Sequence, residues 1–244
     1  MELIHPERRP ITPDELASGL QLGQLAPAGR PYVGLNMVST LDGKATIEWR
    51  TKGISSDLDR ELFHQLRTQA DAVMVGAGTA RVERYGRIAK SDELRAKRER
   101  EGLAADCLAV VVSASLNLPA DLPLLQQQGQ KVAIATGADA VLQGTQADID
   151  YLRVGDDLQL LLARLHEEYG VRSVLCEGGP TLNSHLFAGG LVDELFLTMS
   201  PKVSGGAAAL TIVAGRNLVE PVEMAPVSVA TGDGELFTRW RSRR

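Results

Sequence analysis

The residues best suited to chemistry follow an apolar run, Ser173 to Cys176, in the order Glu177, Gly178, Gly179 and Pro180. The run predicts a buried strand and the glycines predict a turn. Proline is common at the first position of a helix, because its φ is fixed and it lacks an N–H group, so Pro180 predicts a helix start. Such a strand, turn and helix start direct backbone N–H groups at an anion, and glycine has no side chain to keep a phosphate away. A turn of this kind can also be only a tight connection, so its flanks decide the interpretation.

A second turn of the same form follows the apolar run Asp71 to Val75, where Gly76, Ala77, Gly78 and Thr79 lead into a predicted helix. Two such turns in one chain are stronger evidence for a phosphate-containing ligand than either turn alone. Glu177 would repel a phosphate, so we interpret it as a contact for the other end of that ligand.

Two further polar residues have both a structural and a functional interpretation. Asn36 interrupts the apolar run Tyr32 to Val38, and a buried amide needs partners, which can be backbone groups or a bound ligand. Arg67 comes near the end of a helix predicted from Ser55, where a basic side chain suits the helix dipole. The residues alone leave both alternatives open.

These candidates are placed by a chain in which predicted strands and helices alternate. Alternation of this kind predicts an α/β fold with a mostly parallel sheet covered by helices on both faces. The sequence around Gly232-Asp233-Gly234 adds an antiparallel C-terminal hairpin, and ligands of such sheets bind beyond the carboxyl ends of the strands. Strands are expected at 32–38, 71–75, 108–112, 131–135, 173–176 and 193–199, and helices at 12–22, 55–67, 157–169 and 181–187. The charged segment 91–102 has little apolar stripe, so we expect an exposed helix or an insertion there, without chemistry.

Bulk properties exclude several classes of protein. A chain of 244 residues fits one domain, and we divide it into an N-terminal extension, 1–30, and a main domain, 31–244. The net charge of −5 argues against non-specific nucleic-acid binding. No apolar run approaches the roughly 20 residues of a membrane span, and the N-terminus lacks the apolar core of a signal peptide. Cys107 and Cys176 are expected to be buried, reduced thiols, so the chain is interpreted as cytoplasmic.

Several common catalytic motifs are missing from the sequence. No histidine forms an HExxH pair or pairs with cysteine at ligand spacing, so no metal site is expected. There is no GxSxG elbow, no Walker A loop and no zinc-deaminase spacing. Repeated phosphate-compatible turns with a few buried polar residues fit a dinucleotide and a small polar substrate, which favours a nucleotide-binding oxidoreductase.

Taken in order, the motifs of the chain resemble those of the riboflavin-biosynthesis pyrimidine reductases. The similarity spans about residues 31 to 240, and at Asn36 the chain is similar to the stand-alone archaeal and fungal reductases, where the bifunctional bacterial enzymes often carry Lys. The motifs are Asn36 to Lys44, Gly53 to Ser56, Leu66-Arg67, Val75 to Thr79, Glu177 to Thr181 and Pro201-Lys202.

The resemblance implies a dihydrofolate-reductase-like fold, NADPH as cofactor and a homodimer. It further implies that the sugar of a phosphoribosylamino-pyrimidine, either 5-amino-6-(5-phosphoribosylamino)uracil or its 2,5-diamino precursor, is reduced to the ribityl form. Two alternatives stay open: another NADPH-dependent reductase of a pterin-like substrate such as dihydrofolate, and a nucleotide-binding protein without turnover.

The resemblance also assigns roles to residues of this chain. Asn36, Thr51, Arg67 and Glu177 fall at substrate positions, with Arg67 on the phosphate. Glu177 and Asn36 are the candidate catalytic residues, because an anionic Glu177 near C1′ would favour the positive charge that develops there. The positions implied for NADPH are Val38, Gly53, Gly76, Thr79, Glu83, Ser113, Gly178, Gly179, Pro180, Thr181, Leu182, Asn183 and Ser184.

Overall fold

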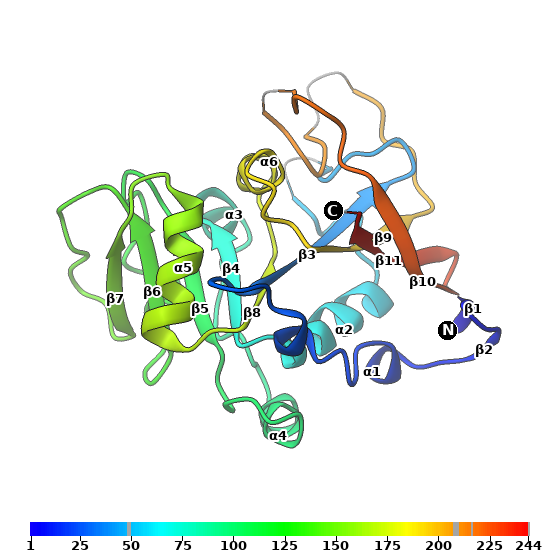
Figure 1. Ribbon diagram of the computed structural model, residues 1–244, viewed down its shortest axis with the longest axis horizontal. Coiled ribbons are helices and arrows are strands. Elements are labelled where there is room, and N and C mark those ends of the chain that lie inside the picture. Colours follow the sequence, from blue (N-terminus) through cyan, green and yellow to red (C-terminus); the bar gives the residue numbers. More distant parts are fainter. Residues whose placement is uncertain (48–49, 207–209, 216, 244) are drawn as a thin grey trace. The chain divides into compact units, whose positions relative to one another are not determined.

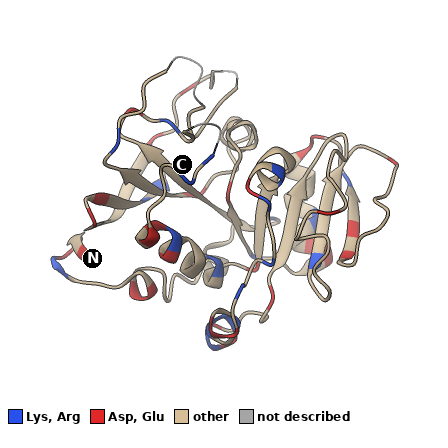
Figure 2. Ribbon diagram, turned by 180° about the vertical axis from the view of Figure 1, so that it is seen from behind, with Lys and Arg blue, Asp and Glu red and all other residues tan. Residues whose placement is uncertain are grey.

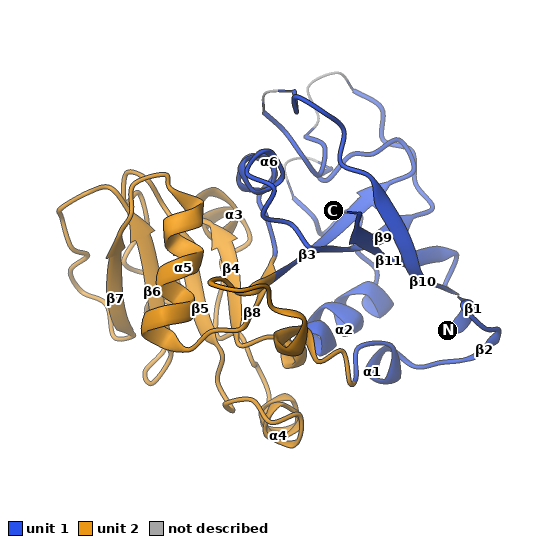
Figure 3. Cartoon of the chain, viewed as in Figure 1, with its two compact units in different colours: residues 1–18, 33–66, 177–244 blue, residues 19–32, 67–176 orange. Residues whose placement is uncertain are grey.

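The computed structural model describes residues 1–47, 50–206, 210–215 and 217–243. The chain forms two compact units, which Figure 3 shows in different colours. Unit 1 contains Met1–Ser18, Val33–Leu66 and Glu177–Arg244, and unit 2 contains Gly19–Tyr32 and Arg67–Cys176. The first 32 residues contribute to both units. The division into an extension, 1–30, and a main domain, 31–244, stays a prediction.

Unit 2 is built on parallel strands in the order β8-β4-β5-β6-β7 (Figure 1). The inner strands are almost fully buried apolar runs, as is typical of parallel strands covered on both faces. The strands are β4 (Ala72–Gly76), β5 (Leu108–Val112), β6 (Lys131–Thr136), β7 (Asp148–Arg153) and β8 (Ser173–Cys176), and the helices are η1 (Leu22–Leu25), η2 (Arg67–Gln69), α3 (Ala77–Val82), α4 (Asp92–Arg100) and α5 (Leu158–Tyr169).

The strands of unit 1 follow the order β2-β1-β10-β11-β9-β3. β3 and β9 are parallel, and the remaining pairs are antiparallel. β10 and β11 form the predicted hairpin, in which Asp233 and Gly234 both have positive φ, the conformation that a two-residue type I′ turn requires. The strands are β1 (Glu2–His5), β2 (Arg9–Pro10), β3 (Tyr32–Thr40), β9 (Glu194–Ser200), β10 (Met224–Gly232) and β11 (Glu235–Ser242), and the helices are α1 (Pro13–Leu16), α2 (Asp57–Leu66) and α6 (Pro180–Ala188).

The predicted elements with clear local signals are confirmed. α5 begins after Asp157, whose side chain accepts a hydrogen bond from Leu160 N at 2.9 Å, and ends at Gly170 in the left-handed conformation. The capping box predicted at Thr12 is present, but the helix ends at Leu16 instead of Leu22. Strands β1, β2 and β7 were not predicted, because they are short or alternate polar with apolar residues.

The expectation that 91–102 forms an exposed helix is partly wrong. The segment does contain a helix, α4, and Figure 2 shows basic and acidic residues mixed along it. Lys97 and Arg98 are nevertheless buried, and Arg98 has no exposed surface. Buried charged residues, which give the helix no apolar stripe, therefore attach α4 to the rest of unit 2.

Candidate active site

In unit 2, the predicted glycine turn lies where two parallel strands end together. Gly76, the last residue of β4, is paired with Val112 of β5, so Ser113 follows at the same end of the sheet. α3 starts directly after Gly76, and no side chain caps its N-terminus in the described structure. No described heavy atom outside the helix lies within 4 Å of the position that a Cβ at Gly78 would take. The turn is therefore open to a ligand that contacts the backbone.

Two more predicted cofactor residues lie in α3 and directly after it. Thr79 lies in the first turn, and Glu83 follows the last residue of the helix. The N–H of Glu83 donates to the carbonyl of Thr79 at 2.9 Å, so the two residues lie one helical turn apart. Both side chains are half-buried. The structure thus brings Gly76, Thr79, Glu83 and Ser113 to one end of unit 2.

In unit 1, the second glycine turn leads from Glu177 into α6. Glu177 is only 6% exposed, and Gly178 has a φ of +84°, which glycine adopts without strain. The Gly178–Gly179 peptide bond is cis. Gly179 is the N-cap of α6 and supplies no side chain, so the first-turn N–H groups of Thr181 and Leu182 have no side-chain cap in the described structure. An anion could accept hydrogen bonds there.

Asn183 and Ser184 support this turn from inside unit 1. Asn183 is fully buried, and its Nδ2 donates to Ile212 O at 2.8 Å and contacts Met37 Sδ at 3.2 Å. Ser184 is packed against Gly215 so closely that a Cβ on that glycine would lie 2.6 Å from Ser184 Oγ. These two predicted cofactor residues therefore hold the N-terminal half of α6 against the 212–215 segment.

Gly178→Ala is expected to weaken both the fold and cofactor binding. An alanine at this φ costs about 1–2 kcal/mol of unfolding free energy. Its Cβ would also lie 3.3 Å from Met37 Sδ, so Met37 would have to move. Thermal unfolding and NADPH titration measure the two effects. Gly129→Ala is the matched control, because Gly129 has a φ of +77° with open space around it, and equal NADPH affinities in the two variants would contradict the role of the turn.

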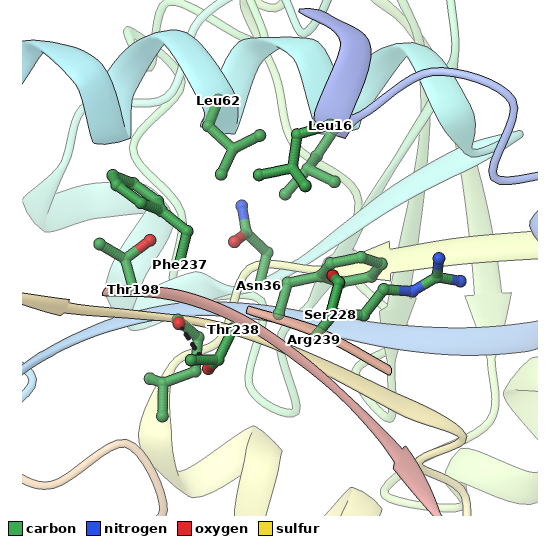
Figure 4. Close-up of a pocket in the computed structure, with 11 residues that line it drawn as sticks. Leu16, Asn36, Leu62, Thr198, Ser228, Phe237, Thr238 and Arg239 are labelled. Carbon is green, nitrogen blue, oxygen red and sulfur yellow. Dashed lines mark hydrogen bonds between the residues drawn. The ribbon is translucent and has the colours of Figure 1, made fainter. Parts of the chain in front are cut away.

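Asn36 lines a small cavity in unit 1, which Figure 4 shows beneath α1 and α2. Its side chain points from β3 toward Leu16 and Leu62 on those helices. The cavity has a volume of about 20 Å³, enough for one water molecule and too small for a pyrimidine ring. Val38 follows two residues later on β3, opposite Thr198 of β9. The catalytic and substrate roles of Asn36, like the cofactor role of Val38, stay predictions.

Thr51 and Gly53 lie in the loop before α2, and this loop is held by Lys202. Lys202 Nζ donates to the carbonyls of Gly53 at 2.9 Å and Ile54 at 3.3 Å. The carbonyl of Thr51 accepts from Ile54 N at 2.8 Å and from Ser55 N at 3.0 Å. Lys202 belongs to a motif for which the sequence predicted no role, because its partner lies 149 residues away.

Two carboxylates stabilise the adjoining start of α2. Asp59 accepts from Ser55 Oγ at 2.5 Å, and Glu235 of β11 accepts from Ser56 Oγ at 2.6 Å. Burial raises the pKa of Asp59, although hydrogen bonds from Ser55 and Thr198 oppose the shift. Burial also raises the pKa of Glu235; the Ser56 hydrogen bond and the charge of Lys202 oppose this shift, whereas the charges of Asp59 and Asp233 add to it.

Glu235→Gln is expected to make the stability of the protein less dependent on pH. A carboxyl whose pKa is raised by folding binds its proton more tightly in the folded state, so stability falls as pH rises through the raised pKa. Removing this group should increase the unfolding free energy at neutral pH by about 1 kcal/mol, the usual size of a single-residue effect, and should change little at pH 4. Urea unfolding from pH 4 to 8 measures the difference. If the unfolding free energies of variant and wild type differ by the same amount at every pH, Glu235 does not have a raised pKa in the folded state. Glu223→Gln, on the surface of the same unit, is the control.

Arg67 begins η2 in unit 2 and is only 5% exposed. Its Nη1 donates to Ile88 O at 3.1 Å, and its guanidinium lies over the ring of Tyr85, 5.5 Å from the centroid. The interpretation of Arg67 as a solvated partner of the helix dipole is therefore wrong. Its role in substrate binding stays a prediction.

The described residues include no group of three or more His, Cys, Asp and Glu side chains arranged to hold a metal ion. Cys107 and Cys176 are buried and not joined in a disulfide. None of the helices that the structure describes combines the length and apolar character needed to cross a membrane.

The strand orders, the parallel β4–β5 and β3–β9 pairs and the C-terminal hairpin define the class of this protein as a dihydrofolate-reductase-like α/β protein, as predicted. The model of the RibD C-terminal domain matches residues 31–237, and the chain belongs to that family. This confirms the resemblance noted in the sequence and places the chain among reductases.

Relatives of known name agree with this membership. The 2,5-diamino-6-ribosylamino-4(3H)-pyrimidinone 5′-phosphate reductase of Archaeoglobus fulgidus is 33% identical over 215 residues, which are 86% of this chain and 97% of the relative. The enzyme of the same name from Methanothermobacter thermautotrophicus is 33% identical over 78% of this chain and 87% of its own. The crystal structure of a pyrimidine reductase-like protein from Corynebacterium diphtheriae has a TM-score of 0.74 at 20% identity, covering 96% of this chain and 100% of that one, which supports the fold.

Proposed function

We propose that this protein uses NADPH to reduce a phosphoribosylamino-pyrimidine to its ribitylamino form in riboflavin biosynthesis. The observation that supports this most strongly is the 33% identity to the archaeal 2,5-diamino-pyrimidinone phosphate reductase over nearly the whole length of that enzyme. The substrate we favour is accordingly the 2,5-diamino compound, with the deaminated uracil as the other candidate. A homodimer is part of the proposal and is testable by light scattering.

The residues present fit a phosphate-containing cofactor. In unit 2, the open turn at Gly76 and Gly78 exposes backbone N–H groups, with Thr79, Glu83 and Ser113 beside it. In unit 1, the turn from Gly178 to Leu182 has first-turn N–H groups without a side-chain cap, supported by Asn183 and Ser184. Val38 and Gly53 complete the proposed set. NADPH would supply the hydride when bound.

The protein's own groups would orient the substrate and favour the charge that develops on it. C1′ of the opened sugar carries partial positive charge, so reduction there depends mainly on positioning. The buried carboxylate of Glu177 would stabilise that charge in a site of low dielectric constant. Arg67 would bind the phosphate, because an arginine fork matches a phosphate in shape and charge. Asn36 and Thr51 are the remaining proposed substrate contacts.

The experiment that tests this function follows NADPH absorbance with three substrates side by side: the diamino-pyrimidine phosphate, the deaminated uracil phosphate and dihydrofolate. We expect oxidation with the first compound. Oxidation with dihydrofolate alone would favour a pterin reductase. NADPH binding without oxidation of any substrate would favour a nucleotide-binding protein without turnover.

A further inference from the structure

Arg98 is a fully buried charged residue on a helix that has no apolar stripe. Arginine is almost never fully buried in proteins unless it is paired with other groups. The reason for its burial is therefore to be found in the groups that its guanidinium contacts.

The guanidinium of Arg98 binds the main chain at the first residue of η2 and at the residue directly after it. Its Nη1 donates to the carbonyl of Arg67 at 2.6 Å and to the carbonyl of Ala70 at 2.7 Å, and its Nε donates to Ala104 O at 2.7 Å. Carbonyls at the end of a helix lack partners within the helix, and those of Arg67 and Ala70 belong to η2 and to the residue that follows it. One arginine thus fixes the backbone from which the side chain of Arg67 projects.

The side chain of Arg67 is held from the other direction by the loop that precedes α4. Ile88 O accepts from Arg67 Nη1, and the ring of Tyr85 lies beneath the guanidinium. Ile88 is itself only 1% exposed, and its N–H donates to Gln130 Oε1 at 3.4 Å. The carbonyl of Ile88, which accepts the hydrogen bond from Arg67, is therefore held in place.

Asp106 connects that loop to α4. It accepts two hydrogen bonds from Arg87, at 3.0 and 2.7 Å, and pairs with Arg95 of α4 at 3.2 Å. Although partial burial acts to raise it, the Arg87 hydrogen bond and charge hold the pKa of Asp106 below its ordinary value. The carboxylate thus stays charged, and it links Arg87, next to Ile88 in the loop, to Arg95 of α4.

We propose that Arg98 is a positioning residue for substrate binding, which sets the direction of Arg67 by holding its carbonyl. The proposal rests on the proposed role of Arg67 as the phosphate contact. α4 and the 85–88 loop then have a function that their sequences do not indicate: together they position the arginine that binds the phosphate. The ligand affected is the phosphate group of the substrate and no other part of it.

Arg98→Lys is the informative substitution, because lysine keeps the charge but cannot reach three carbonyls with a planar fork. We expect KM for the phosphorylated pyrimidine to rise about tenfold, less than the hundredfold that a 1 Å misplacement can cost, with kcat within a factor of about two. The same pyrimidine without its phosphate should show an unchanged KM. In an Arg67→Ala background, Arg98→Lys should have no further effect on KM, since coupled residues are non-additive.

Controls separate this role from a purely structural one. Arg98→Met removes all donors and tests the stability contribution by thermal unfolding; if it does not fold, the lysine variant still decides the question. Arg100→Lys, exposed on the same helix, should leave both substrates unaffected. An equal rise in KM with and without the phosphate, or an additive effect in the Arg67→Ala background, would overturn the proposal. An Arg67→Ala variant with normal KM would instead overturn the proposed role of Arg67, and the present inference with it.

Discussion

Glu177→Gln is expected to lower kcat/KM for the phosphorylated pyrimidine by about a hundredfold, the range found when one group that stabilises transition-state charge is removed. Glutamine keeps the size and the hydrogen-bonding oxygen of Glu177 but removes its negative charge. Because the carboxylate is only 6% exposed, water screens its field weakly, so the lost charge should matter more than at the surface. The effect should appear in kcat, since the positive charge at C1′ develops in the transition state.

Steady-state kinetics with NADPH and the diamino-pyrimidine phosphate measure this effect, and NADPH titration should show an unchanged dissociation constant. Glu223→Gln carries the same change of charge on the surface of unit 1 and should keep wild-type kinetics. A Glu177→Gln enzyme with normal kcat/KM would show that the carboxylate takes no part in the reaction.

Arg67→Ala should raise KM for the phosphorylated substrate by about a hundredfold, with a small change in kcat, because charge-assisted bidentate hydrogen bonds to phosphate are among the strongest in proteins. The guanidinium is already oriented by Ile88 O and by the ring of Tyr85, so little side-chain entropy remains to be lost when phosphate binds. Removing it deletes an interaction made equally in the ground state and the transition state, which is why KM carries the effect.

Arg67→Lys tests geometry separately from charge, and we expect about a tenfold rise in KM because a lysine cannot form the fork. The dephosphorylated pyrimidine should bind the wild type and both variants equally. If the alanine variant keeps a normal KM for the phosphorylated compound, phosphate is bound elsewhere.

Those parts of the fold whose signals are local could be predicted from the sequence. Asp157 and Gly170 delimit α5, and the glycines at 76 and 178 mark turns, because each of these residues acts within a few positions of itself. The predicted strands in both units were right for the same reason: an apolar run and its bounding turn lie next to each other in the chain.

The environment of the candidate site could not be predicted in this way, because it depends on contacts between distant residues. Arg98 reaches carbonyls 31 and 28 residues earlier, and Lys202 holds a loop 149 residues earlier. In the sequence, Arg98 is one of several charges on a polar helix, and Arg67 suits the end of a helix in solvent. Only the folded chain shows that both arginines are buried.

The pairing of β1 with β10 has a practical consequence. The family match begins at residue 31, yet Glu2, Leu3 and His5 pair with Thr231, Ala230 and Val229 on one side of β10. A shortened chain that starts at the family boundary would expose that side of β10 as a template on which strands of other molecules can assemble. We therefore expect the opening residues to protect unit 1 against aggregation, so a recombinant version of the protein should keep them.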